Sequence, residues 1–331
     1  MKNKVIVLGS LAFDYIMAFE ENFINAVSID PVNEKYQSTV TAKTRIQRFG
    51  GTAGNIAYNL GLLYIAHVSL FGSVGTDFEN LGYKAHMDKF KNIELGVDIH
   101  PDLFTAACYI VNDIKANQMI VFHGGALDRS RDINLIEKIK DPENYLYAIN
   151  STQSVEAMTS FADQLFNMKI PMIFDPGQVT PLFPKDTLLE IIHQSEILIG
   201  NSYEISQIKL KTELSDEKIL DLVKAIIITK GEQGSELLYC DQNKKIFKIE
   251  IPIAKPKKIQ DTTGAGDGYR AGILSGLILN LTLLDSCRLG SIVSSFVIET
   301  SGAQTQDYTI QDVRKRFFDT YGYVPSGLES L

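Results

Sequence analysis

Short apolar runs alternate with amphipathic segments along most of this chain. The runs have the length of strands, and the segments between them repeat apolar positions at the spacing of one helix face. Because the runs contain few polar residues, they predict strands of a parallel sheet that helices cover on both faces. The predicted strands are Val5–Leu8, Val68–Phe71, Tyr145–Ile149, Pro171–Phe174, Ile197–Ile199 and Ala225–Thr229, and the predicted helices include Ala53–Tyr64, Glu79–Lys91, Val155–Phe166 and Ser202–Leu210. With right-handed crossovers these elements predict one α/β domain over residues 1–331, with three layers and a mostly parallel sheet.

Two regions, residues 13–48 and 103–122, break this alternation. The first contains the polar, β-branched run Tyr36–Thr44, and the second contains two strand-like runs, Thr105–Val111 and Gln118–Phe122. Neither region has a good helical partner, so we predict a small β-sheet lid, inserted twice, that covers a cleft. The alternative is a pair of surface hairpins without a role. Exposed lid strands are also candidate edges for a homodimer.

Composition narrows the class of protein. The 331 residues are 45% hydrophobic and 22% charged, an ordinary balance for a globular domain, and the net charge of −8 argues against nucleic acid or a membrane surface as a general partner. The longest apolar stretch, residues 271–284, is too short to cross a bilayer. Cys108, Cys240 and Cys287 form neither a disulfide framework nor a zinc pattern, which favours a reducing cytoplasm.

The stretch from Asp261 to Asp267 carries the most specific chemistry. Its Gly-Ala-Gly turn (Gly264, Ala265 and Gly266) opens an apolar helix whose first turn contains Asp267. Backbone N–H groups at a helix start lack intrahelical partners and, with the helix dipole, favour an anion. Asp267 can take a proton from a hydroxyl above the turn. An anion hole beside a base suits transfer of a phosphoryl group to an alcohol, although a glycine turn with a capping aspartate is the simpler alternative.

Other familiar patterns do not occur in the sequence. The turn is not a Walker A loop, and no dinucleotide-binding glycine fingerprint follows the first strand, which argues against a dehydrogenase. The five histidines lack metal-ligand spacing, and there is no Gly-x-Ser-x-Gly nucleophile elbow.

Two glycine-containing segments near the N-terminus can bind a polar ligand. The first strand leads into Gly9–Asp14, and the carboxyl ends of strands are where α/β sheets bind ligands. Asp14 can accept hydrogen bonds from the two hydroxyls of a sugar diol, or it can be a turn residue. Gly50 and Gly51 precede a predicted helix whose first turn holds Asn55, which offers both a donor and an acceptor.

Two further segments follow predicted strands. Asn201 and Glu204 have the spacing of a helix cap, and the same spacing lets both face a hydrated Mg²⁺ that bridges phosphates. A glycine turn that follows the strand Ala225–Ile228 is suited to lie along a nucleotide, and it comprises Thr229, Lys230, Gly231, Glu232, Gln233 and Gly234.

In this order, from Gly9 to the helix at residues 291–300, the segments resemble the ribokinase-like (PfkB) family of carbohydrate and nucleoside kinases. The resemblance implies a large α/β domain with a β lid, and transfer of the γ-phosphoryl group of ATP, with Mg²⁺, to a primary hydroxyl. It implies that Asp267 is the catalytic base and that the amides of Gly264, Ala265 and Gly266 form the anion hole. Some relatives also require a monovalent cation such as K⁺. The sequence does not show whether this protein binds one near Asp261.

The same resemblance implies binding roles for the other residues. Ser10, Asp14, Gly51 and Asn55 hold the acceptor's hydroxyls. Asn201 and Glu204 organise the Mg²⁺–phosphate network, with Glu204 acting on the metal through water, and residues 229–234 line the nucleotide.

Within the family the chain looks most like the bacterial adenosine kinases. That resemblance makes Phe122 a residue that stacks on a purine and Gln178 one that bonds its edge. Cys108, Val179 and Leu182 depart from the pattern. The expected reaction is therefore phosphorylation of the 5′-hydroxyl of a nucleoside, with adenosine first among the acceptors. A sugar kinase and a non-catalytic nucleoside-binding protein are the alternatives.

Overall fold

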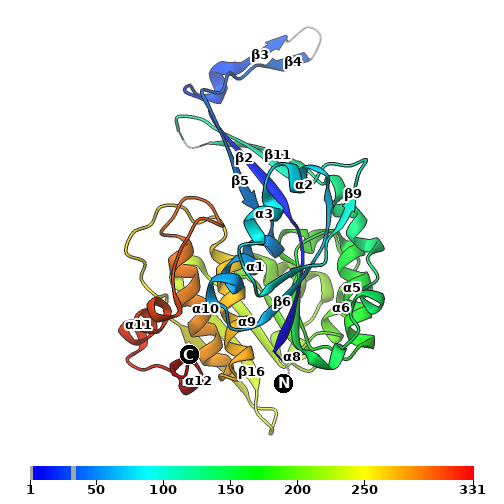
Figure 1. Ribbon diagram of the computed structural model, residues 1–331, viewed down its shortest axis with the longest axis vertical. Coiled ribbons are helices and arrows are strands. Elements are labelled where there is room, and N and C mark those ends of the chain that lie inside the picture. The colour runs from blue at the N-terminus through cyan, green and yellow to red at the C-terminus, as the bar shows by residue number, and fades with distance from the viewer. Residues whose placement is uncertain (1–2, 31–34, 116) are drawn as a thin grey trace.

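The computed structural model describes residues 3–30, 35–115 and 117–331 (Figure 1). Within these residues nine strands form the main sheet, in the order β17-β16-β15-β14-β13-β12-β1-β6-β8. Neighbours from β15 to β8 pair in parallel, whereas β16 and β17 add an antiparallel edge. The strands are β1 (Lys4–Leu8), β6 (His67–Phe71), β8 (Ile93–Leu95), β12 (Tyr145–Ser151), β13 (Met172–Asp175), β14 (Ile197–Asn201), β15 (Ala225–Thr229), β16 (Ser235–Cys240) and β17 (Ile246–Ile251).

Helices cover both faces of this sheet because its strands bury alternate residues on opposite sides. Val5 and Val7 of β1 belong to the core cluster shared with α1 (Thr52–Leu63), α9 (Ala265–Ile278) and α10 (Leu283–Val297). Ile6 and Leu8 belong to the cluster shared with α5 (Val155–Asn167), α6 (Lys185–His193) and α7 (Ser202–Thr212). The predicted α/β fold of three layers with a mostly parallel sheet is therefore confirmed.

The predicted helix Glu79–Lys91 is wrong as a single element. It is divided into α2 (Asp77–Asn80) and α3 (Tyr83–Met87), because Gly82 between them has φ 86°, which no helix can continue. The remaining elements are α4 (Leu135–Lys138), α8 (Asp216–Leu220), α11 (Ile310–Tyr321), α12 (Ser326–Glu329), β7 (Ser73–Gly75) and β9 (Asp98–His100).

A second sheet of four strands, in the order β11-β10-β2-β5, forms the lid at one end of the molecule (Figure 1). Its strands are β2 (Ala12–Ala18), β5 (Thr44–Gly50), β10 (Ala106–Asn112) and β11 (Gln118–His123). Of the run Tyr36–Thr44, the first three residues lie in β4 (Lys35–Ser38), residues 39–43 lie in no strand, and Thr44 begins β5. β4 pairs with β3 (Val27–Asp30) in a ribbon that extends beyond the lid (Figure 1). Residues 31–34 and 116 of the predicted lid segments lie outside the described residues.

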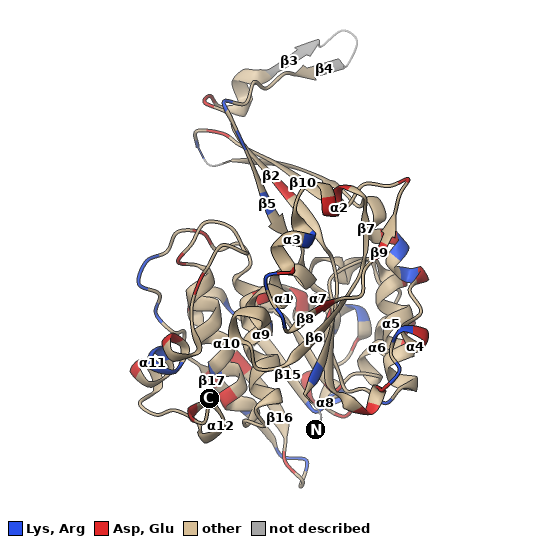
Figure 2. Ribbon diagram, in the orientation of Figure 1, with Lys and Arg blue, Asp and Glu red and all other residues tan. Residues whose placement is uncertain are grey.

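The outer strand of the lid, β11, exposes an apolar row. Met119, Ile120, Val121 and Phe122 are 41%, 56%, 58% and 56% exposed. The homodimer through this edge stays a prediction. Elsewhere acidic and basic residues are interspersed, for example on α11, where Lys315 pairs with Asp319 at 2.6 Å (Figure 2). Across the described residues, no helix combines the length and the apolar character needed to cross a membrane.

Candidate active site

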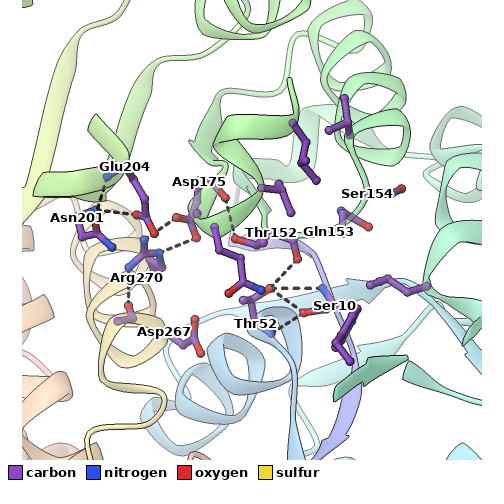
Figure 3. Close-up of a pocket in the computed structure, with 18 of the residues that line it drawn as sticks. Ser10, Thr52, Thr152, Gln153, Ser154, Asp175, Asn201, Glu204, Asp267 and Arg270 are labelled. Atoms are coloured by element: carbon purple, nitrogen blue, oxygen red, sulfur yellow. Dashed lines mark hydrogen bonds and ion pairs between the residues drawn. The ribbon is translucent and has the colours of Figure 1, made fainter. Parts of the chain in front are cut away.

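A cleft of about 790 Å³ lies at the carboxyl ends of the central strands and extends to the lid. Parallel strands bring their carboxyl ends to one edge, so the last residues of β13, β14 and β15 line the cleft together with residues that directly follow β12. In Figure 3, Asn201, Glu204 and Arg270 lie across the cleft from Ser10 and Thr52. The predicted site residues that line it are Ser10, Phe122, Gln178, Asn201, Glu204, Thr229, Gly266 and Asp267.

The turn before α9 has the open amides that an anion needs. Gly264 has φ 79°, and a Cβ at this position would lie 2.4 Å from the Cβ of Ala303, so a side chain does not fit. The N–H of Ala265 donates to the carbonyl of Thr262 at 3.2 Å, whereas the N–H groups of Gly264 and Gly266 make no backbone hydrogen bond within the described part of the chain. Two of the three amides predicted for the anion hole are therefore open to a ligand.

Asp267 is held by Asn55 of α1. The Nδ2 atom of Asn55 donates to Oδ2 of Asp267 at 2.7 Å. Burial raises the pKa of Asp267 to about 6, although the bond from Asn55 and the charge of Arg270 act to lower it. A carboxylate with this pKa is mostly ionised at neutral pH and remains basic enough to accept a proton. The predicted role of Asn55 in binding the acceptor's hydroxyls stays a prediction, and the structure shows its amide in contact with the predicted base.

Asp14 lies in β2, where the lid begins. Its carboxylate accepts no hydrogen bond from the residues that the structure describes, and burial raises its pKa to about 6, with a further increase from the charge of Asp261. Gly51 permits close packing here, because a Cβ on it would lie 2.4 Å from the carbonyl oxygen of Ser10. Asp14, Gly51 and Asn55 do not themselves line the cleft, whereas Ser10, Thr52 and Asp267, which lie next to them, do.

A buried ion pair joins β13 to the turn of α9. Arg270 donates to both carboxylate oxygens of Asp175, at 2.6 and 2.5 Å, and to the carbonyl of Gly266 at 3.0 Å. Ser151 adds a hydrogen bond to Asp175 at 2.6 Å. Both members of the pair line the cleft, and sequence reasoning assigned a role to neither. The sequence did contain an indication of this pair, a lone arginine in an apolar helix, because a buried charge needs a partner.

Asn201 and Glu204 form a reciprocal cap at the start of α7. Oδ1 of Asn201 accepts from the N–H of Glu204 at 2.9 Å, and Oε2 of Glu204 accepts from the N–H of Asn201 at 2.7 Å. This is the helix cap that the sequence left as an alternative. Burial raises the pKa of Glu204. No cluster of three or more His, Cys, Asp or Glu suited to a metal occurs among the described residues.

The predicted nucleotide segment is only partly in the cleft. Thr229 lines it, whereas Gly231, Glu232 and Gln233 form an exposed 3-10 turn just beyond β15. The side chain of Lys230 pairs with Glu236, which is 3% exposed, so it is held by the protein itself. The role of residues 229–234 toward a nucleotide stays a prediction.

Three residues that line the cleft, one aromatic and two with side-chain amides, are candidates for contact with a planar ring. Phe122 and Gln178 are exposed and line the cleft, as does Gln153, which follows β12 and which sequence reasoning missed. Gln153 is 3% exposed, and neither Nε2 nor Oε1 has a hydrogen-bond partner among the described residues. A buried amide without partners is rare in folded proteins and is explained by a ligand or water. The sequence indicated Gln153 only by its position, as a polar residue directly after a predicted strand.

Asp261 joins two loops. Its carboxylate accepts from the N–H of Thr263 and from the N–H of Gly302, each at 2.9 Å. Burial acts to raise its pKa, but these hydrogen bonds and the charge of Arg48 lower it overall. The monovalent cation near this residue stays a prediction.

A three-layer α/β domain with a β lid, and a carboxylate beside an open helix start, define the ribokinase-like class of phosphotransferases. The family model of the pfkB carbohydrate kinases matches residues 2–310, and the chain belongs to this family. The resemblance noted in the sequence is thereby confirmed at the level of the family.

Relatives of about 30% identity that span almost the whole chain include nucleoside kinases, whereas the sugar kinases of the family that match are less similar to this chain. One from Methanocaldococcus jannaschii is 31% identical over 325 residues, which cover 95% of this chain and 96% of that protein. The nucleoside kinase of Burkholderia thailandensis in complex with inosine has a TM-score of 0.82 at 31% identity, covering 97% of this chain and 99% of that one. Its structure in complex with ADP-inosine has a TM-score of 0.80 at 32% identity, covering 97% of each chain. These comparisons support nucleoside kinases as a group, and not adenosine kinases in particular.

Proposed function

We propose that this protein transfers the γ-phosphoryl group of ATP to the 5′-hydroxyl of a nucleoside. The observation that carries the proposal is Asp267, a carboxylate with a pKa of about 6 that lies beside the open amides of the α9 turn. The nucleoside kinase relatives, one of them solved with inosine, support the choice of acceptor.

In the proposed reaction Asp267 takes the proton of the 5′-hydroxyl as its oxygen bonds to the γ-phosphorus. The amides of Gly264 and Gly266 and the dipole of α9 stabilise charge on the transferring group. The bond to the β-phosphate oxygen breaks, and ADP leaves. Closure of the lid over the acceptor excludes water, which would otherwise receive the phosphoryl group.

The acceptor is held where the cleft meets the lid, with Asp14 and Gly51 just beyond the cleft-lining Ser10. The ionised carboxylate of Asp14 accepts hydrogen bonds from the ribose hydroxyls, and Ser10 and Gly51 shape the same end. Phe122 stacks on the base, and Gln153 and Gln178 bond its edge. Because neither amide atom of Gln153 has a hydrogen-bond partner among the described residues, the amide can turn to match a 6-amino or a 6-oxo purine. We therefore propose adenosine and inosine as the acceptors.

ATP enters as its magnesium complex. Asn201 and Glu204 would act on a phosphate-bound Mg²⁺ through its water, and the ion would offset charge on the phosphates. Oε2 of Glu204 accepts a hydrogen bond in the helix cap, and Oε1 takes no part in that bond. Asn201 and residues 229–234 lie along the nucleotide.

A 5′-deoxynucleoside tests the proposal. This analogue keeps the diol and the base but has no hydroxyl to phosphorylate. We expect 5′-deoxyinosine and 5′-deoxyadenosine to compete with the parent nucleosides while yielding no phosphorylated product. Phosphorylation of either analogue would show that another hydroxyl is the acceptor and would contradict the proposal.

A further inference from the structure

We infer that Gln304 is a positioning residue for the base, because it fixes the orientation of the Asn55 amide that contacts Asp267. Gln304 lies in the loop after α10, and its Nε2 donates to Oδ1 of Asn55 at 2.9 Å. The other end of the same amide, Nδ2, donates to Asp267 at 2.7 Å. Only the kinetic part of this inference rests on the proposed function.

An asparagine amide can turn by half a rotation with little change in shape, so its partners determine which atom faces which neighbour. If Asn55 were turned, its oxygen would face the carboxylate of Asp267 and lose the hydrogen bond. Its Nδ2 would then face Nε2 of Gln304, bringing two donors together. The NH₂ group of Gln304 therefore selects the orientation in which Asn55 donates to the base.

Gln304 is itself held in one orientation by Tyr83 of α3. The hydroxyl of Tyr83 donates to the carbonyl of Gly50 at 2.7 Å, so toward Gln304 it can only accept, and Nε2 donates to it at 2.8 Å. Asn55, Gln304 and Tyr83 are 6%, 3% and 0% exposed, so water competes little for these bonds. Oε1 of Gln304 has no hydrogen-bond partner among the described residues, so the two acceptors of Nε2 favour this orientation.

The hydrogen bonds reach the strand on which the lid begins. Gly50 ends β5 and pairs with Ala12 of β2, and a Cβ on Gly50 would lie 2.4 Å from the carboxylate of Asp14. The chain of bonds from Asp267 through Asn55, Gln304 and Tyr83 thus ends next to the residue proposed to bind the acceptor.

Several charged groups surround Asp267, and each must be considered in a titration. Arg270 of α9 lowers its pKa, whereas the carboxylates of Asp175 of β13 and Asp14 of β2 raise it. His86 of α3 packs near Gln304, and burial lowers its pKa to about 4, so it is uncharged where Asp267 titrates. Burial raises the pKa of Tyr83, which keeps its proton throughout. Gln304 acts to raise the pKa of His86 and to lower that of Tyr83, so Gln304→Leu moves both pKa values further from neutral pH and leaves both groups uncharged.

The direct test is the titration of Asp267 by NMR, with ¹³C-labelled aspartate carboxyl groups and with Asp267→Asn to assign the signal. In Gln304→Leu the donor to Asn55 is lost, and we expect the apparent pKa of Asp267 to rise by about one, the size expected for a weakened hydrogen bond to a charged group. Gln306→Leu is the matched control. Gln306 lies in the same loop, is 1% exposed and donates to Oδ1 of Asn59 at 3.0 Å, one turn along α1. It should leave the pKa unchanged.

A double-mutant cycle shows whether Gln304 acts through Asn55. With Asn55→Ala already present, adding Gln304→Leu should not move the pKa of Asp267 further. Tyr83→Phe is the milder variant if Gln304→Leu does not fold: it frees the Gln304 amide to turn and should shift the pKa in the same direction by less. An unchanged pKa in every folded variant of Gln304 and Tyr83 would overturn the inference, as would equal shifts in Gln304→Leu and Gln306→Leu.

The kinetic test follows the same variants. The acidic limb of the kcat profile should move to higher pH in Gln304→Leu and stay in place in Gln306→Leu, with little change in the KM for the nucleoside. If the wild-type protein transfers no phosphoryl group, the proposed function fails, while the NMR titration still decides the role of Gln304.

Discussion

Nδ2 of Asn55 lies 2.7 Å from Oδ2 of Asp267, although the two residues are 212 positions apart in the chain. The contact joins the first turns of α1 and α9, two helices that each follow a glycine turn at the same edge of the sheet. The segment predicted to bind the acceptor and the segment predicted to supply the base are therefore in direct contact.

Replacement of the base should abolish most of the chemistry without abolishing binding. Asp267→Asn keeps the shape of the side chain but cannot accept the proton, so kcat should fall by about 10²–10⁴-fold while KM changes little. Nucleoside binding measured by calorimetry serves as the control for folding. A variant with the wild-type kcat would remove Asp267 from the mechanism.

The activity should fall in acid because two carboxylates must be ionised. The pKa values of Asp267 and Asp14 are both raised to about 6, mainly by burial, so protonation below pH 6 removes the base and the diol acceptor together. At saturating Mg·ATP, the logarithm of kcat/KM for the nucleoside should fall below pH 6 with a slope that approaches two. In Asp14→Asn the slope should be one. A profile that is flat from pH 5 to 8 would contradict both assignments.

The ion pair between Arg270 and Asp175 should matter for stability. Arg270→Met leaves a buried carboxylate without its partner, so the free energy of unfolding should fall by about 3–5 kcal/mol. Lys224→Met is the control, because Lys224 pairs with Glu196 on the surface, with 68% of its side chain exposed, and should cost less than about 1 kcal/mol. Urea titration followed by circular dichroism measures both. Equal losses in the two variants would show that the buried pair has no special role.

The amide of Gln153 should contribute to recognition of the base. Gln153→Leu keeps the volume but removes both polar atoms, so kcat/KM for inosine and adenosine should fall by about 2–10-fold, the value of one neutral hydrogen bond. The KM for ATP should not change and serves as the internal control. If kcat/KM for both nucleosides is unaffected, the unpartnered amide of Gln153 must be explained by water instead.

The sequence predicted the fold well because its strands are continuous apolar runs, which burial on two faces requires. It was wrong about Glu79–Lys91, because the apolar pattern continues across Gly82, where the backbone conformation ends the helix. Asn201 and Glu204 show that the spacing of two residues alone does not determine their role. The same interval suits a helix cap and a metal network, and the structure shows the cap.

Residues whose function depends on distant partners could not be predicted. Gln304 lies in a loop with no motif of its own, and its contacts with Asn55 and Tyr83 arise only when α1, α3 and that loop pack together. Arg270 and Gln153 gave weaker signals, a charge in an apolar helix and a polar residue after a strand. Their significance comes from burial, which the sequence does not report.

The most direct test of the account is ADP release from Mg·ATP with a panel of nucleosides and free sugars as acceptors. We predict turnover with adenosine and inosine, and none with ribose or fructose. Turnover with the sugars alone would be consistent with the family and with the proposed role of Asp267, but it would contradict the assignment of a nucleoside as the acceptor. No turnover with any acceptor would contradict the proposed phosphoryl transfer itself.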